Sequence, residues 1–200
     1  MAYSDFTLAL LEERLGLAYE ETTGAFEGAT PIVASEVLRQ TLDRGLPVVL
    51  GRNKEKARSE MLISPILLEL REYQERQVSI FSGAEFNVDR KNGLAGFCDF
   101  LIARSPYQTD IVAPVVAIVE AKHEDLNDGI AQCFAEMYAA RLFNEKRGKP
   151  IETIYGATTS GTAWRFLRLA GTLAQADLTE YHISQVEKIL GILVGMLREP

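Results

Sequence analysis

Two apolar runs that contain charged residues decide the expected fold: Gly96-Phe97-Cys98-Asp99-Phe100-Leu101-Ile102-Ala103 and Val115-Val116-Ala117-Ile118-Val119-Glu120-Ala121-Lys122. Each run has the length and the β-branched or aromatic content of a strand. A carboxylate inside such a run is costly to bury unless a partner or a cation compensates it. Side chains alternate along a strand, so Glu120 and Lys122 are expected on one face. The runs therefore predict neighbouring strands that bring two acids and a lysine together.

The composition is that of a globular protein. The chain has 200 residues, of which 47% are hydrophobic and 24% charged, enough for one domain with a well-buried core. Its net charge of −7 argues against a protein that coats nucleic acid with a broadly basic surface. Both cysteines, Cys98 and Cys133, lie in apolar sequence, which favours buried thiols in a reducing compartment.

The first residues lack the basic start and the apolar core of a signal peptide. The sequence also contains no apolar run long enough to cross a membrane. A cytoplasmic protein without membrane contact is therefore expected.

The elements are expected to form one domain over residues 1–200, with N-terminal helices in 5–45, a core in about 55–170 and a C-terminal helix over 178–198. Residues 30–45 are expected to form the second helix, closed by Gly45, and residues 46–50 an extended segment. Pro65 either kinks the helical stripe of residues 59–73 or begins a new helix there.

The core is expected to be α/β, with a mixed sheet of about four or five strands flanked by helices. Besides the two runs quoted above, the strand candidates are residues 78–88, 154–159 and 162–169, the last two forming a hairpin. A helix is expected over residues 127–147, because apolar residues recur there at helical spacing.

An acid on the helix before the strands, then Asp99, then Glu120-Ala121-Lys122 follow one another in the order of a known motif. In this the chain resembles the PD-(D/E)xK superfamily, the restriction-endonuclease-like nucleases, over roughly residues 60–169. The local sequences around Asp99 and Glu120 also resemble those of the nuclease domain of type I restriction subunits. The chain departs from the motif at Cys98, which replaces a proline, and at Glu136, where one branch has a tyrosine.

The resemblance implies a site for Mg²⁺ or Mn²⁺, cations that prefer oxygen ligands. Asp99 and Glu120 would be metal ligands in it. Glu60 would complete the metal site, with Glu69 as the alternative acid of that helix. The lone Glu-x-Lys pattern is also common at a solvated strand end.

Two further residues receive roles from the resemblance. Lys122 would orient the attacking water or offset charge on the phosphate. Gln132, on the helix that follows, would position substrate or a second water. Alternatively, Gln132 is simply a solvated residue at the border of its helix.

The resulting hypothesis is a metal-dependent nuclease that hydrolyses phosphodiester bonds. DNA is the expected substrate, although the sequence does not distinguish DNA from RNA. The alternative is a non-catalytic module of the same fold that binds nucleic acid or a protein partner.

Three surface features have two interpretations each. The basic run at residues 51–58 could follow phosphates or be a solvated face. Trp164 could stack on a base or pack in the core. The apolar seam from Ile183 to Leu197 could form a homodimer surface or pack on its own domain.

Overall fold

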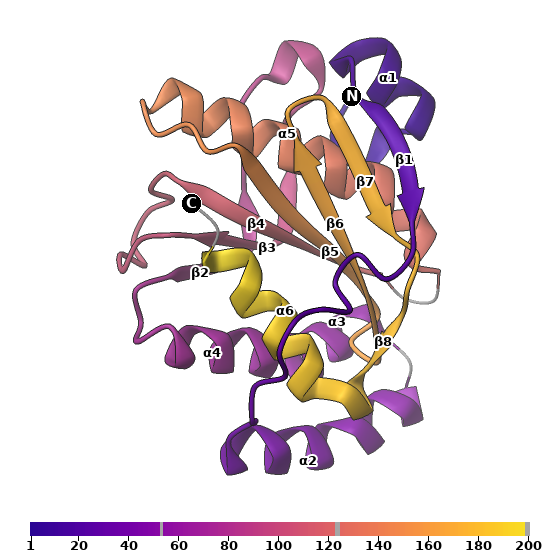
Figure 1. Ribbon diagram of the computed structural model, residues 1–200, viewed down its shortest axis with the longest axis vertical. Coiled ribbons are helices and arrows are strands. Elements are labelled where there is room, and N and C mark those ends of the chain that lie inside the picture. The colour runs from indigo at the N-terminus through magenta and orange to yellow at the C-terminus, as the bar shows by residue number, and fades with distance from the viewer. Residues whose placement is uncertain (53, 123–124, 199–200) are drawn as a thin grey trace.

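The computed structural model describes residues 1–52, 54–122 and 125–198 of the chain. It is an α/β structure with a mixed eight-stranded sheet in the order β1-β7-β6-β5-β4-β3-β2, and β8 pairs with β6 (Figure 1). The expected class is therefore confirmed. The sheet is larger than the about four or five strands expected from the sequence.

The strands are β1 (Ala18–Thr22), β2 (Ser79–Glu85), β3 (Phe97–Ala103), β4 (Val115–Ala121), β5 (Thr153–Thr159), β6 (Ala163–Ala170), β7 (Leu173–Asp177) and β8 (Tyr181–His182). The α-helices are α1 (Leu8–Leu15), α2 (Glu36–Arg52), α3 (Glu55–Arg58), α4 (Ser64–Tyr73), α5 (Ile130–Lys146) and α6 (Val186–Arg198). Short 3₁₀ turns are η1 (Tyr3–Asp5), η3 (Arg90–Asn92), η4 (Leu126–Gly129) and η5 (Ile183–Gln185), and η2 (Ser59–Ile63) is a π-helical turn.

The apolar runs that the sequence analysis identified form the middle of the sheet. Strand β3 pairs antiparallel with β2 and with β4, and β4 pairs parallel with β5. Strands β5 and β6 form the expected antiparallel hairpin. The parallel register places Glu120 beside Thr158.

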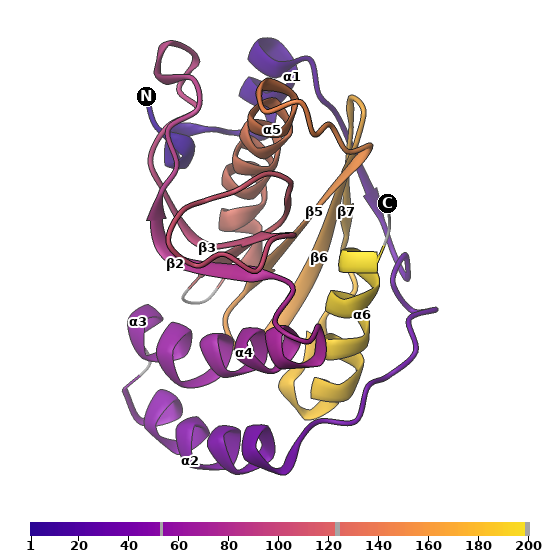
Figure 2. The ribbon, with the colours of Figure 1, turned by 90° about the vertical axis from the view of Figure 1, so that its left-hand side faces the viewer.

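Each face of the sheet has its own apolar core. Helices α1 and α5 cover one face, where Ile118 and Leu167 lie among the buried residues. Helices α2, α4 and α6 cover the other face, where Val119 and Phe166 are buried. Figure 2 shows α5 and α6 on opposite sides of β5 and β6. The alternation of buried residues in the strands thus matches a sheet covered on both faces.

The second helix lies further along the chain than expected. Helix α2 passes through Gly45 and Pro47 to Arg52, so the expected stop at Gly45 and the extended segment after it are both wrong. A Cβ on Gly45 would lie 2.8 Å from the carbonyl oxygen of Met61. This glycine therefore permits close packing of α2 against η2, and its sequence signal resembles that of a helix end.

The start of the C-terminal helix is also corrected. A helix from residue 178 is wrong, because β7 runs to Asp177, β8 and η5 follow, and α6 begins at Val186. The buried Asp177 carboxylate accepts hydrogen bonds from the backbone N–H groups of Gly24, Phe26 and Thr179, at 3.0, 3.3 and 3.0 Å. The acid thus ties β7 to the loop after β1 and does not cap a helix.

The apolar seam of α6 packs inside its own chain. Leu190, Leu193 and Leu197 are buried against the core shared with α2 and α4. Of the two interpretations of this seam, packing on its own domain is therefore the one that the structure has. Within the described ranges, no helix has both the length and the apolar content needed to cross a membrane.

Pro65 lies inside a helical segment that continues from α3 through η2 into α4. Arg58, Ser59, Ile63 and Ser64, at the junctions of these elements, all have right-handed helical backbone angles, so no non-helical residue marks a fresh start at Ser64. The π-helical turn η2 directly precedes Pro65, which occupies the first turn of α4. Of the two interpretations left open by the sequence, the structure therefore has an interrupted helix and not a new one.

Candidate active site

Asp99 lies where β3 separates from β4. The last paired residues of the two strands are Phe100 and Val119, and Phe100 is the chain neighbour of Asp99. The Asp99 Oδ2 atom accepts a hydrogen bond of 2.8 Å from the backbone N–H of Ala121. This bond continues the connection between the two strands and holds the half-buried carboxylate next to the end of β4.

Glu120 is the most deeply buried carboxylate of the predicted set. Its side chain is 3% exposed, and its Oε1 atom accepts a hydrogen bond of 2.8 Å from Lys122 Nζ. Its Oε2 atom is buried without a hydrogen bond from the described residues, as is Oγ1 of the neighbouring Thr158. Burial and the charge of Asp99 raise the pKa of Glu120 to about 8, although Lys122 acts in the opposite direction. An additional cation at this position would compensate the buried charge.

Lys122 is held from two sides. Its Nζ atom donates to Glu120 Oε1 and, at 3.1 Å, to Gln132 Oε1. Burial acts to lower the pKa of Lys122, but the attraction of Glu120 outweighs it and the pKa is raised. The lysine is therefore a cation with a defined position at the end of β4.

Gln132 comes from the first turn of α5, so this helix delivers a residue directly to the strand ends. Its Nε2 atom donates at 3.0 Å to Oε1 of Glu136, one turn further along the helix. Its amide is oriented by these two partners, Lys122 on the oxygen and Glu136 on the nitrogen.

Glu136 is an acid of the site that the sequence analysis did not identify. It is completely buried, and its Oε2 atom lacks a hydrogen bond within the described part of the chain. Burial and the charge of Glu120 raise the pKa of Glu136 well above its usual range. Hydrogen bonds thus link four side chains in a row: Glu120, Lys122, Gln132 and Glu136.

Gly129 makes room for this arrangement. A Cβ at this position would lie 3.0 Å from both Cγ and Cε of Lys122 and 3.0 Å from Cγ2 of Thr158. Its backbone is in the ordinary helical region, with φ −92°. A side chain at Gly129 would therefore press on Lys122 and Thr158, whereas the backbone conformation would accept one.

The two candidate acids of the preceding helix have different surroundings. Glu69 accepts hydrogen bonds from the backbone N–H and the hydroxyl of Ser35, at 2.7 and 2.8 Å, so it supports the start of α2. Glu60 instead lines a cavity of about 280 Å³ together with Asp99 and Glu55. Glu60 therefore lines the same cavity as Asp99, whereas Glu69 is bound to Ser35 at the start of α2. The charge of Glu55 also contributes to raising the pKa of Glu120.

These positions permit a test of whether a metal would fit. Within the described residues, no three His, Cys, Asp or Glu side chains converge into a metal-binding group as the side chains stand. Asp99 and Glu120 nevertheless lie next to each other on β3 and β4, since their neighbours Phe100 and Val119 are paired and the charge of Asp99 acts on Glu120. Glu120 Oε2 is a buried acceptor without a donor among the described residues. Oxygen donors of this kind suit Mg²⁺ or Mn²⁺, and Glu60 lines the cavity from the opposite side.

The other basic and aromatic features have structural roles. Arg58 is buried and donates to the carbonyl oxygen of Ser160 at 2.6 Å, which connects α3 to the β5–β6 turn. Trp164 is buried and stacks on Phe166, with ring centroids 6.2 Å apart. The core interpretation of Trp164 is therefore the right one, while Lys56 of the same basic run remains exposed beside Glu60.

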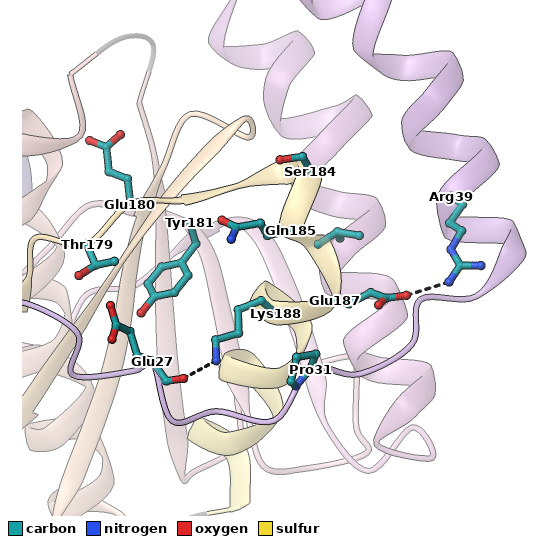
Figure 3. Close-up of a pocket in the computed structure, with 11 residues that line it drawn as sticks. Glu27, Pro31, Arg39, Thr179, Glu180, Tyr181, Ser184, Gln185, Glu187 and Lys188 are labelled. Atoms are coloured by element: carbon teal, nitrogen blue, oxygen red, sulfur yellow. Dashed lines mark hydrogen bonds and ion pairs between the residues drawn. The ribbon is translucent and has the colours of Figure 1, made fainter.

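A pocket of about 730 Å³ lies where β8 meets α6, and none of the acids above lines it (Figure 3). Two cations line this pocket, and each already has a partner. Arg39 pairs with Glu187 at 2.8 Å, and Lys188 donates to the carbonyl oxygens of Glu27 and Ala29 (Figure 3). Its size alone does not make it a reaction site, because both of its lining cations already have partners.

Comparison of the chain with protein-family models, with curated proteins and with solved structures finds no match. The chemistry of the site must therefore be argued from its own residues.

Proposed function

We propose that this protein is a metal-dependent nuclease that hydrolyses phosphodiester bonds, with DNA as the expected substrate. The observation that supports this most is the buried Glu120 carboxylate, with Lys122 Nζ on one oxygen and no described partner on the other. A structural ion pair would need neither an unpaired carboxylate oxygen nor a second acid, Asp99, beside it. A site that receives a cation and a phosphate would need both the unpaired oxygen and the second acid.

The metal would be Mg²⁺ or Mn²⁺, held by Asp99 and Glu120, with Glu60 supplying a further carboxylate across the cavity. When bound, such a cation supplies Lewis-acid activation of water and of the scissile phosphate. The protein's part is to hold the carboxylates at fixed positions, which the bond from Ala121 N–H does for Asp99.

Lys122 would contribute positive charge where negative charge develops on the phosphate oxygens. Its ammonium is fixed by Glu120 and Gln132, so little reorganisation is needed when substrate arrives. Gln132 acts on Lys122, and Glu136 acts on Gln132, so both are positioning residues in this proposal.

The test is a cleavage assay in Mg²⁺ and in Mn²⁺ with linear, circular and single-stranded DNA and with RNA. Asp99→Asn is the informative variant, because its amide oxygen can still accept from Ala121 N–H while the carboxylate is lost. Asp43→Asn, an exposed acid on α2, is the matched control. Calorimetric titration with Mn²⁺ gives a second readout that does not depend on turnover.

We expect cleavage and Mn²⁺ binding by the wild type and by Asp43→Asn, and loss of both in Asp99→Asn. Mn²⁺ binding and cleavage that survive in Asp99→Asn and in Lys122→Ala would refute the assignment of the site. Absence of cleavage on every substrate, with nucleic-acid binding retained, would favour the non-catalytic module instead.

A further inference from the structure

A second cavity adjoins the acidic one, between α4, β2 and β3. Its volume is about 410 Å³. Ser82 and Phe100 line both this cavity and the acidic cavity that contains Asp99. The two cavities are therefore separated by the thickness of single side chains, and both views of the ribbon place α4 beside β2 (Figures 1 and 2).

The two cavities differ in chemistry. The acidic one is lined by Glu55, Glu60 and Asp99. The second has apolar walls, from Leu67, Leu68, Ile80 and Phe100, and among the described residues that line it none is acidic. We call it the apolar pocket.

Besides two serines, Arg71 and Gln108 are the polar residues that line the apolar pocket. Turning the Gln108 amide so that its oxygen faces Arg71 Nε, at 2.9 Å, and its nitrogen faces the carbonyl oxygen of Ile80, at 3.3 Å, satisfies the hydrogen-bonding groups on both sides. Arg71 is only 20% exposed, and its ion pair with Glu72 spans 3.8 Å, a weak contact. A guanidinium is thus held in the wall of an apolar pocket by a neutral partner.

Flat apolar walls with a few hydrogen-bonding groups at the rim are what enzymes use to hold a nucleobase outside a stack. The base faces contact aliphatic or aromatic side chains, and the base edge meets donors such as a guanidinium. Leu68, at 58% exposure, leaves the entrance open.

We propose that the apolar pocket receives an unpaired nucleobase of the strand that is cut, from the nucleotide next to the scissile phosphate. This inference rests on the proposed function, because the phosphate at Asp99 places the adjoining base at the pocket. A base between α4 and β2 cannot keep its Watson–Crick partner. The substrate is therefore single-stranded nucleic acid or a locally unpaired end or flap, and not an intact duplex.

The β2 side of the acidic cavity is accessible. Gly83, which lines this cavity, has φ +60°, and a Cβ built on it would have no atom within 4 Å. Phe97, at the start of β3, is 67% exposed. Ser82 and Gly83 are also exposed, and Ser82 lines both cavities, so a strand can approach from this side.

Binding is measured without metal, in EDTA, so that the strand stays intact. The probes are fluorescein-labelled single strands of about 12 nucleotides, a length within the usual site size, the same strands with one abasic position moved along them, and the matching duplex. A 2-aminopurine at each position reports which base leaves its stack.

Two variants change the pocket, and each has a matched control. Leu68→Asp places a charge at the pocket entrance, and Leu8→Asp makes the same change on the partly exposed Leu8 of α1. Arg71→Gln removes the rim cation, and Arg76→Gln removes a cation just beyond α4 whose side chain is 68% exposed. Thermal unfolding of all four establishes that they are folded.

We expect single strands to bind more tightly than the duplex, and one abasic position to weaken binding about tenfold, as expected for the loss of one stacked base. Leu68→Asp and Arg71→Gln should weaken binding similarly and remove the sensitivity to that position, whereas the controls should not.

Equal binding of abasic and intact strands, with cleavage retained in Mn²⁺, would overturn the inference but not the proposed function. Failure to bind or cleave any nucleic acid would overturn both. A concentration-dependent dimer abolished by Leu68→Asp would assign the pocket to a second copy and likewise overturn the inference.

Discussion

Replacing both members of the Glu120–Lys122 pair by methionine should leave the fold about as stable as the wild type, whereas replacing Lys122 alone should not. The reason is the environment of the pair, in which the Glu120 side chain is 3% exposed and the Lys122 side chain 20% exposed. At their separation of 2.8 Å and an effective dielectric constant of about 20, the gross attraction is about 6 kcal/mol. The desolvation of two charges offsets most of this gain.

Lys122→Met removes the attraction and keeps the desolvation cost of Glu120, whose Oε2 atom already lacks a described partner. One-sided removal from a buried pair costs about 3–5 kcal/mol, and the partial exposure of Lys122 reduces this to about 2–3 kcal/mol. For a chain of this size, that corresponds to a fall of about 4–12 °C in the midpoint of thermal unfolding. In Glu120→Met/Lys122→Met no unpaired charge remains, and we expect a free energy of unfolding within about 1 kcal/mol of the wild type.

The assay is urea unfolding of the wild type, both single variants and the double variant, followed by circular dichroism, with cleavage measured on the same samples. A double variant that is stable but inactive would mean that the charges serve the reaction and not the fold. A double variant at least as destabilised as Lys122→Met would refute this reasoning, because the pair would then be structural.

Five further variants test four individual positions. Glu136→Gln keeps an acceptor for Gln132 Nε2, whereas Glu136→Leu does not. We expect Glu136→Leu to lower kcat by about tenfold or more at unchanged KM, and Glu136→Gln to restore most of this loss. Equal losses of kcat in both variants would exclude a positioning role for Glu136. Gly129→Ala should lower the cleavage rate by a similar factor with little change in the midpoint of thermal unfolding, because its Cβ displaces Lys122 by contact. An unchanged cleavage rate would mean that Lys122 moves freely. Glu69→Ala should cost about 1–2 kcal/mol of stability through its lost hydrogen bonds to Ser35 and leave cleavage intact. Glu60→Ala should lower cleavage and leave stability intact. The opposite pattern in the two assays would make Glu69 the acid of the site and Glu60 a structural residue.

The centre of the sheet could be predicted from the sequence because apolar residues dominate its strands. Strands β3 and β4 lie within the runs identified from composition and alternation, and β5 and β6 match theirs to within one residue at each end. Strand β1 could not be predicted, because Ala18-Tyr19-Glu20-Glu21-Thr22 is polar and mostly exposed. It pairs with β7 from the other end of the chain, and a sequence pattern read locally does not reveal such a pairing.

The acids on the strands were similarly accessible to sequence reasoning, whereas Glu136 was not. Alternation alone places Glu120 and Lys122 on one face, and their hydrogen bond agrees with that. An acid one turn after a glutamine on a helix is usually solvated, so nothing in the local pattern marks Glu136 as buried. Its burial follows from the tertiary packing of α5 on β4 and β5, where a Cβ on Gly156 of β5 would lie 2.5 Å from Met137 Sδ and 3.0 Å from Cys133 Sγ.

The balance of charge in the site argues that it is built for a ligand. Asp99 and Glu120 each raise the pKa of Glu136, and Lys122 is the cation that acts against them. A fold that needed only stability would gain by replacing such groups with apolar side chains of similar volume. The chain instead supports the acids with Gln132, with the Ala121 N–H and with the space left by Gly129. Under the proposed function, a cation bound by these carboxylates would relieve their repulsion, and the energetic cost of the site in the free protein would become binding energy for the metal.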